Sequence, residues 1–377
     1  MPSVARYDVI VIGAGPAGST TAYRLARAGA RVCLMDRARF PRDKPCGGGL
    51  TLRAVRELPF SVEPVVEDRI ETIELGFRYT RRWSRRAKQP LVLMTQRRRL
   101  DAFLAEQAVT AGAEFRDGSK VTAVDPSGRV AIDGERLDAD VVVGADGANG
   151  ITARSLGRPA PEHGVALEGN VAYTHVSRER FQGRAVAELG AVPGGYAWVF
   201  PKGDHVNVGV GGWQSEGPRL RDHLRELCAA FEIDEAEVRD LRGHRLPMRG
   251  ASMRPVEGRL LLVGDAAGLV DPLSGDGMYE AVFSGRLAAD AALEFLHGRA
   301  RDLDAYAERF APAFAPLESI SWRAKLAFER FPHLAFRLAT TNVSWRLFQA
   351  VVRGDRRASD THGLRGAPLR VLQALGV

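Results

Sequence analysis

Three glycines and one aspartate near the start of the chain have the types and spacing needed to bind a dinucleotide. Gly13 allows a tight turn after an apolar run, Gly15 lets the backbone approach a pyrophosphate, and Gly18 allows a helix to pack closely on a strand. The N–H groups at the start of that helix attract phosphate. Asp36 ends a second apolar run, where its carboxylate can accept hydrogen bonds from ribose hydroxyls. The pattern predicts a dinucleotide site rather than a glycine-rich turn that binds nothing, and the charge of Asp36 favours FAD or NAD over NADP.

Two later aspartates also follow the pattern of buried strands. Asp146 lies in the turn after residues 141–144, and Asp265 ends the apolar run that begins at Leu260. A carboxylate at the carboxyl end of a parallel strand can accept hydrogen bonds from ribose or ribityl hydroxyls. The glycine-rich segment after Asp265 opens a helix near Met278, whose N–H groups would stabilise negative charge on a flavin ring. These elements favour FAD over NAD.

A cysteine and three aromatic residues are the other candidates for chemistry. Cys46 lies in the glycine-rich loop 44–48, where a thiol can donate a proton, position a substrate or simply pack. Tyr196, Trp198 and Phe200 alternate along a predicted strand, so all three face one side. Such a face is either ordinary core or the wall of a cavity for a long apolar ligand. The eight histidines have no metal-ligand spacing, so we expect no metal site.

The elements that must position these residues have the pattern of an α/β protein with an inserted antiparallel-sheet domain and a helical C-terminal region. We expect FAD-binding segments at 1–75, 97–165 and 256–300, substrate-domain segments at 76–96 and 166–255, and the helical region at 301–377. The residue pattern also predicts a helix at 235–241. The C-terminal helices are expected to be interrupted by Pro312, Pro316 and Pro332.

Three of these motifs, in their order along the chain, resemble the flavoprotein superfamily typified by p-hydroxybenzoate hydroxylase. They are residues 13–18, 145–147 and 264–265. The resemblance spans most of residues 1–300 and implies a Rossmann-type FAD-binding domain of the p-hydroxybenzoate hydroxylase type.

A second set of motifs is similar to geranylgeranyl reductases. Residues 193–201, followed after seven residues by the Gly209–Gly211 pair, resemble the aromatic signature of that family. The loop 44–48 resembles its KxCGG loop, and residues 263–277 resemble its flavin loop. This narrower resemblance is weakest at residues 53–90 and after about residue 310.

The family resemblance implies a noncovalent FAD that, once reduced, passes hydride to C=C bonds of a polyprenyl chain, such as a geranylgeranyl lipid or a menaquinone tail. It implies NADPH, NADH or a ferredoxin as electron donor. The residues expected to bind the cofactor are Gly13, Ala14, Gly15, Pro16, Ala17, Gly18, Asp36, Arg37, Cys46, Gly47, Gly48, Arg97, Val121, Asp146, Gly147, Gly264, Asp265, Pro272, Gly275, Gly277 and Met278. Those expected to act in catalysis are Cys46, Tyr196 and Trp198, and those expected to bind substrate are Tyr196, Trp198, Phe200, Pro201, Gly209 and Gly211.

Two other functions fit the same fold. One is a flavin-dependent monooxygenase that hydroxylates an aromatic or polyketide-like substrate, and the other is a flavin-bound lipid carrier without activity. Oxygen discriminates between the enzymes, because a monooxygenase forms a peroxyflavin and a reductase needs no oxygen. The segment from Tyr196 to Gly211 favours the reductase.

Composition and charge restrict the partners. The 377 residues include 53 Lys+Arg and 46 Asp+Glu, a net charge of +7 that favours phosphates or an anionic membrane face, and no nucleic-acid motif accompanies it. Three cysteines without a CxxC pair fit a reducing cytoplasm, and no apolar run is long enough to cross a membrane. The C-terminal segment mixes large apolar residues with arginines, which fits a helix lying on an anionic membrane or an ordinary helical cap. We expect a cytoplasmic protein and leave open both peripheral contact with the inner face of the membrane and the oligomeric state.

Overall fold

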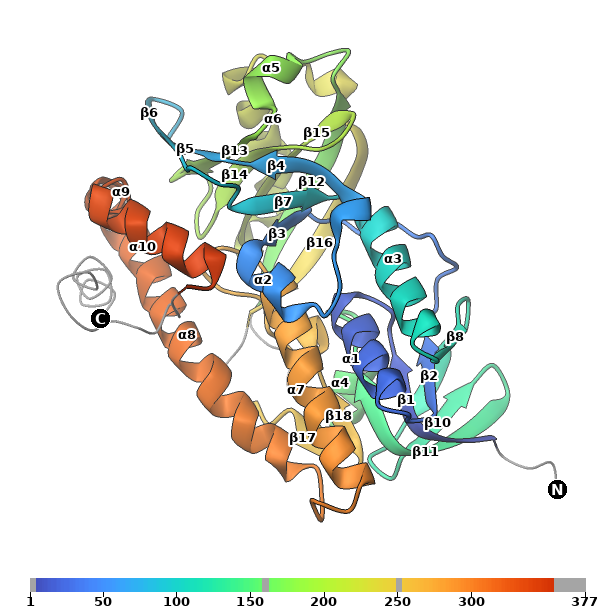
Figure 1. Cartoon of the computed structure of the whole chain (residues 1–377). Helices are drawn as coiled ribbons and strands as arrows, with labels where there is room; N and C mark the ends of the chain where they lie inside the picture. The colour runs from blue at the N-terminus through green and yellow to red at the C-terminus, as the bar shows by residue number, and fades with distance from the viewer. Residues whose placement is uncertain (1–4, 158–162, 249–252, 356–377) are drawn as a thin grey trace.

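A sheet of mostly parallel strands occupies the lower half of the computed structural model, which describes residues 5–157, 163–248 and 253–355 (Figure 1). Its strand order is β17 (Val256–Glu257), β18 (Leu260–Leu262), β11 (Glu135–Gly144), β1 (Ala5–Ile12), β2 (Val32–Met35) and β8 (Glu114–Arg116). Strands β9 (Val121–Val124) and β10 (Arg129–Ile132) extend antiparallel from β11. The central strands are nearly continuous apolar runs because both faces of the sheet are covered.

Three helices cover one face of this sheet: α1 (Pro16–Arg27), α3 (Arg97–Thr110) and α7 (Met278–Leu296) (Figure 1). Helices α1 and α7 approach closely at Gly285, where a Cβ atom would lie 2.6 Å from the Ala17 carbonyl oxygen. The Thr21 hydroxyl donates to the Gly285 carbonyl at 3.1 Å. On the opposite face, Val130 of β10 packs in one cluster with Ile10 of β1. The predicted α/β arrangement is therefore confirmed.

A second sheet of seven strands lies above the first (Figure 1). Its order is β16 (Arg239–Pro247), β12 (His163–Ala172), β15 (His205–Trp213), β14 (Tyr196–Pro201), β13 (Arg184–Leu189), β5 (Thr72–Phe77) and β6 (Arg81–Arg86). Neighbouring strands are antiparallel except β13 and β5, which pair in parallel. Helix α6 (Leu220–Ala230) packs on one face through Leu224 and Leu227 against Val199 and Val208. The other face is turned toward the loop that carries Cys46.

Smaller elements join the two sheets. A three-stranded antiparallel sheet has the order β3 (Gly49–Thr51), β7 (Val92–Thr95) and β4 (Val66–Ile70). The short helices are α2 (Leu52–Glu57), α4 (Thr152–Ser155) and α5 (Arg178–Phe181), and the 3₁₀ turns are η1 (Glu63–Val65), η2 (Gln214–Arg219), η3 (Glu235–Glu237) and η4 (Gly264–Ala267). The C-terminal helices are α8 (Asp304–Arg330), α9 (Pro332–Ala339) and α10 (Asn342–Arg353).

Two local predictions are wrong. Residues 235–241 form the turn η3 followed by the start of strand β16, because pairing of β16 along β12 overrides the local helical pattern. Helix α8 continues through Pro312 and Pro316, which are both exposed, so the carbonyls that they leave unpaired can face water. Pro332 does begin a new helix. The predicted helical region 301–377 extends past residue 355, and its last part lies outside the described residues.

Within residues 5–157, 163–248 and 253–355, none of the helices combines the length and the apolar character that a membrane span requires.

Candidate cofactor and active site

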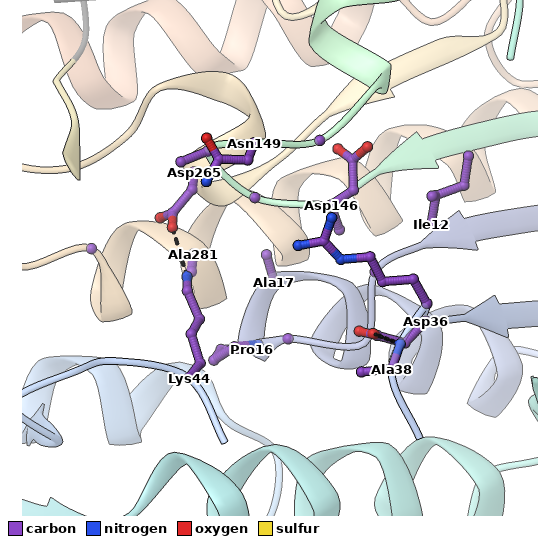
Figure 2. A pocket seen from close by; sticks show the side chains of 18 of the residues that line it. Ile12, Pro16, Ala17, Asp36, Ala38, Lys44, Asp146, Asn149, Asp265 and Ala281 are labelled. Atoms are coloured by element: carbon purple, nitrogen blue, oxygen red, sulfur yellow. Dashed lines mark hydrogen bonds and ion pairs between the residues drawn. The ribbon is translucent and has the colours of Figure 1, made fainter. Parts of the chain in front are cut away.

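A cavity of about 650 Å³ opens at the carboxyl ends of β1, β2 and β11 and beside the start of α1 (Figure 2). Fourteen of the residues expected to bind the cofactor line it: Gly13, Gly15, Pro16, Ala17, Asp36, Arg37, Arg97, Val121, Asp146, Gly147, Asp265, Gly275, Gly277 and Met278. The other seven are not among its lining residues: Ala14, Gly18, Cys46, Gly47, Gly48, Gly264 and Pro272. The structure thus brings together residues from the first 40 positions and residues from beyond position 260.

The glycines at the start of α1 each serve a different contact. Gly13 has a φ of +106°, and a Cβ atom there would lie 2.3 Å from the Ala145 carbonyl oxygen. A Cβ atom on Gly18 would lie 1.9 Å from the Gly13 carbonyl oxygen, so helix and strand could not pack. Gly15, the N-cap of α1, faces the cavity instead. Its missing side chain leaves a space beside helix N–H groups, which is where a phosphate fits.

Two arginines border that space. The position of a Cβ atom on Gly15 lies 3.7 Å from Nη2 of Arg97 and 3.8 Å from Nη2 of Arg42. Asp101 orients both, because its carboxylate accepts two 2.7 Å hydrogen bonds from Arg97 and lies 2.6 Å from Nη1 of Arg42. Burial opposes the charge of Arg97, but the buried Asp101 carboxylate outweighs it and raises the pKa of Arg97. Two fixed guanidinium groups beside a helix N-terminus fit a diphosphate.

Asp36 connects the turns that follow β1 and β2. Its Oδ2 accepts a hydrogen bond from the Ala14 N–H and its Oδ1 accepts one from the Ala38 N–H, both at 2.9 Å. Each carboxylate oxygen can accept a further hydrogen bond. Because Asp36 also lines the cavity, it can accept from a ribose hydroxyl there (Figure 2).

The other two aspartates have different surroundings. Oδ2 of Asp265 accepts a 2.9 Å hydrogen bond from Nζ of Lys44, which reaches it across the cavity (Figure 2). Burial alone would raise the pKa of Asp265, but the Lys44 ammonium brings it below its usual value. Asp146 accepts hydrogen bonds from the N–H groups of Ile151 (2.6 Å) and Thr152 (3.0 Å), so it holds the start of α4. Burial raises the pKa of Asp146 despite these bonds.

The three aromatic residues of β14 form a continuous surface, which we call the aromatic wall (Tyr196, Trp198 and Phe200). Ring centroids are 5.8 Å apart between Tyr196 and Trp198 and 6.2 Å apart between Trp198 and Phe200. The Trp198 ring lies across Gly209 of β15, where a Cβ atom would be 2.1 Å from Cζ2 of the indole. Gly211 lies beside the same ring, but a Cβ atom there would be 3.6 Å from Cζ3, which is an ordinary contact. The wall therefore explains Gly209, and Pro201, one position beyond Phe200, is buried on the opposite face.

The loop that carries Cys46 rests on this wall. A Cβ atom on Gly47 would lie 2.9 Å from the Phe200 ring and 3.8 Å from Nε1 of Trp198. The half-buried Cys46 thiol accepts a 3.4 Å hydrogen bond from the Gly48 N–H. By contrast, Cys33 and Cys228 are buried, and burial raises their pKa values to about 12 and about 11. Of the three thiols, that of Cys46 is the one placed for chemistry.

The loop between η4 and α7 closes the cavity on the side of Tyr196. The Tyr196 hydroxyl donates to the Ser274 carbonyl at 2.6 Å, and burial raises the pKa of that hydroxyl above its usual range. Nζ of the buried Lys325, on α8, donates to the carbonyls of Pro272 (3.0 Å) and Gly194. The C-terminal region thus contacts both the loop at 272 and the turn before the aromatic wall.

Several residues at the site were not predicted to act there. Arg42 and Lys44 come from the loop after β2, and His244 comes from β16 and lines the cavity. Burial, followed by the Lys44 charge, lowers the pKa of His244 to about 4, so its imidazole is neutral at pH 7. Lys44 belongs to a recognised motif, but no spacing in the sequence indicates Arg42 or His244.

The chain is similar to known FAD-binding proteins over most of its length. The FAD binding domain family matches residues 6–318 of this chain. The menaquinone reductase of Mycolicibacterium smegmatis is 35% identical over 310 residues, which are 76% of this chain and 76% of that protein. The chloroplastic geranylgeranyl diphosphate reductase of Oryza sativa is 31% identical over 374 residues, covering 88% of this chain and 78% of that protein.

A solved structure supports the fold. A geranylgeranyl bacteriochlorophyll reductase-like protein from Thermoplasma acidophilum superposes with a TM-score of 0.80, covering 99% of this chain and 100% of that one. The two sequences are 22% identical, so this likeness concerns the fold alone.

Proposed function

Because the chain belongs to the geranylgeranyl reductase family of FAD-binding oxidoreductases, we propose that it reduces C=C bonds in the polyprenyl chain of a lipid. The observation that carries the proposal is the aromatic wall lying directly against the loop of Cys46, whose residues Lys44 and Pro45 line the cofactor cavity. Neighbouring aromatic side chains bind an isoprenoid chain through buried apolar area. The names of the two relatives make a geranylgeranyl lipid and a menaquinone tail the substrates to test.

The residues present fit FAD. Gly15 with the N-terminus of α1 and the arginines 42 and 97 would bind the diphosphate, and Asp36 would accept from the ribose. Asp265 and the loop before Met278 would face the ribityl chain and the flavin ring. When bound, FAD supplies the hydride. His244, which is neutral at pH 7, lines the same cavity as the Lys44–Asp265 ion pair, whose charges act on it.

Reduction of an isolated C=C bond also needs a proton on the neighbouring carbon. Cys46 is the proposed source or the residue that positions the substrate for it, because its thiol is half-buried beside the wall. Tyr196 and Trp198 would hold the chain with the double bond facing the flavin. The electron donor is proposed to be NADPH, NADH or a ferredoxin that docks transiently.

The test is anaerobic. The FAD-loaded protein is reduced with dithionite, mixed with geranylgeranyl diphosphate or menaquinone, and followed by flavin absorbance and product mass. Flavin reoxidation with a gain of two hydrogens in the prenyl chain, located there by fragmentation and not in a quinone ring, is the expected result. If no prenyl compound reoxidises the flavin and a substrate-dependent oxygen uptake appears in air, the protein is a monooxygenase.

The proposal includes contact with an anionic membrane through α9 and α10. These helices contain three arginines and no acidic residue, and they expose Leu334 (44%), Val343 (42%) and Phe348 (39%). Basic helices with exposed apolar side chains bind anionic lipid surfaces. The expected result is co-sedimentation with phosphatidylglycerol vesicles that is lost in a Leu334→Ser/Phe348→Ser variant and kept in Val109→Ser, an equally exposed position on α3. Equal sedimentation of all three proteins would exclude this surface.

A further inference from the structure

Two charged residues near the wall have no part in the function described so far. Lys202 follows β14 directly and is only 6% exposed, although lysine is rare in this arginine-rich chain. Glu168 lies partly buried in the middle of β12. Neither residue lines the cofactor cavity. Burying a charge costs free energy unless partners compensate for it, so their position calls for an explanation.

Both residues bind the backbone of Cys46. The Cys46 N–H donates to Oε1 of Glu168 at 2.8 Å, and Nζ of Lys202 donates to the Cys46 carbonyl at 3.1 Å. The N–H and the carbonyl of Cys46 belong to the two peptide units on either side of its Cα atom, and they are thus held by side chains of opposite charge type. Charge-assisted hydrogen bonds of this kind are about twice as strong as neutral ones.

The strand register places Glu168 on the face of the aromatic wall. Glu168 lies opposite Gly209 on β15, and Gly209 lies opposite Trp198 on β14. Directly opposite residues in antiparallel strands point to the same face. Glu168 therefore reaches Cys46 from the same surface that carries the Trp198 ring, and the thiol and the wall share one support.

The conformation of the loop is also restricted at Gly48. The Gly48 carbonyl accepts hydrogen bonds from the Thr95 N–H (2.8 Å) and the Thr95 hydroxyl (3.0 Å). A Cβ atom on Gly48 would lie 3.0 Å from Cε of Lys202, and the φ of Gly48 is +84°. Lys202 thus packs against the loop with its stem while its ammonium group holds the Cys46 carbonyl.

The protonation of Glu168 fits this role. Burial raises the pKa of Glu168, and the Lys202 charge and the Cys46 N–H oppose that rise. In either protonation state, Oε1 can accept the Cys46 N–H. A glutamine can do the same, which makes the contact testable apart from the charge.

We propose that Glu168 and Lys202 are a pair of positioning residues that act through Cys46, fixing its thiol against the aromatic wall where a substrate double bond would lie. The catalytic role of the pair rests on the proposed function. Whether the pair fixes the Cys46 thiol can be measured without substrate.

The variants are Glu168→Ala, Glu168→Gln and Lys202→Met, with the exposed Glu106→Gln and Lys88→Met as matched controls. Two quantities are measured on FAD-loaded protein: the rate of Cys46 alkylation by iodoacetamide, read by peptide mass, and the rate of flavin reoxidation by the prenyl substrate. Misplacing a reacting group by about 1 Å costs up to ~100-fold in rate. We expect Glu168→Ala and Lys202→Met to lower the limiting rate of flavin reoxidation at least ~10-fold, with the substrate concentration that gives half of this rate nearly unchanged, and to change the alkylation rate. Glu168→Gln should keep both rates within about threefold of wild type.

Two results would overturn the proposal. One is a Glu168→Ala protein whose alkylation and reoxidation rates equal those of the controls. The other is a Glu168→Gln protein as impaired as Glu168→Ala, since that outcome assigns the effect to the carboxyl proton or charge rather than to positioning. If wild-type protein reduces no prenyl compound, the proposed function fails, while the alkylation rates still decide whether the pair fixes the thiol.

Discussion

Replacing Gly209 by alanine tests whether this glycine is required to accommodate the aromatic wall. A Cβ atom would start 2.1 Å from Cζ2 of Trp198, and ordinary carbon contacts begin near 3.5 Å, so the ring must move by about 1.4 Å. Overpacking of this kind costs roughly 1–3 kcal/mol. The shift also strains the 2.8 Å hydrogen bond from Nε1 of Trp198 to Asn207, which contributes about 1 kcal/mol. The expected loss in free energy of unfolding is therefore about 2–4 kcal/mol.

The assay is urea denaturation of the protein without added FAD, followed by flavin reoxidation with the prenyl substrate. Gly243→Ala is the matched control, because a Cβ atom there would lie 3.7 Å from the Ala166 carbonyl oxygen, an ordinary contact in the same sheet. We expect the control to stay within about 0.5 kcal/mol of wild type. Adding Trp198→Phe to Gly209→Ala should recover part of the lost stability, because it removes the indole atom that clashes. If Gly209→Ala unfolds at the same urea concentration as Gly243→Ala, the wall does not explain the glycine.

Two further substitutions separate cofactor binding from stability. Gly15→Ala should fold as stably as wild type, because the added atom lies 3.7 Å from Arg97. It should weaken FAD binding at least ~10-fold, because the methyl group fills the space for the phosphate. Equal FAD affinity of the two proteins in a flavin fluorescence titration would show that the phosphate does not bind there. Burial lowers the pKa of Lys325 from 10.5 to about 8, so between these values the unfolded chain binds the proton more tightly and stability rises with pH. Wild type should therefore gain stability over Lys325→Met from pH 8 to pH 10, and a constant difference across these pH values would contradict the assignment.

The sequence predicted most where local pattern and fold agree. Residues 7–36 contain an apolar strand, three spaced glycines and an aspartate. Each of these favours the same local structure that the fold requires, so β1, α1 and β2 form where expected. The helix predicted at 235–241 was wrong because β16 is an edge strand with mostly polar residues, so it lacks the alternation of apolar and polar residues that indicates a strand. Its pairing with β12 depends on residues far away in the sequence. The breaks predicted at the two exposed prolines of α8 were wrong for a similar reason. The free-energy cost of a proline inside a helix depends on which side of the helix faces water, and the local sequence does not show this.

For the site, the residues within motifs could be predicted and their supporting partners could not. Asp36 and Trp198 stand in recognisable patterns; in the structure Asp36 lines the cavity and the Trp198 ring stacks on that of Phe200. Glu168 reaches Cys46 across 122 positions, and Arg42 meets Asp101 from a separate loop. Such contacts form between segments that are far apart in the sequence, so the spacing of residues within one segment does not predict them.

The loop 42–48 has a consequence for engineering. Within seven residues, Arg42 borders the phosphate space, Lys44 reaches Asp265, and Cys46 lies on the aromatic wall. A single inserted or deleted residue would shift all three at once, so cofactor affinity and substrate choice cannot be tuned separately here. On β16, His244 and Leu246 line the same cavity and lie outside this loop, so substitutions there would leave the loop's three contacts in place.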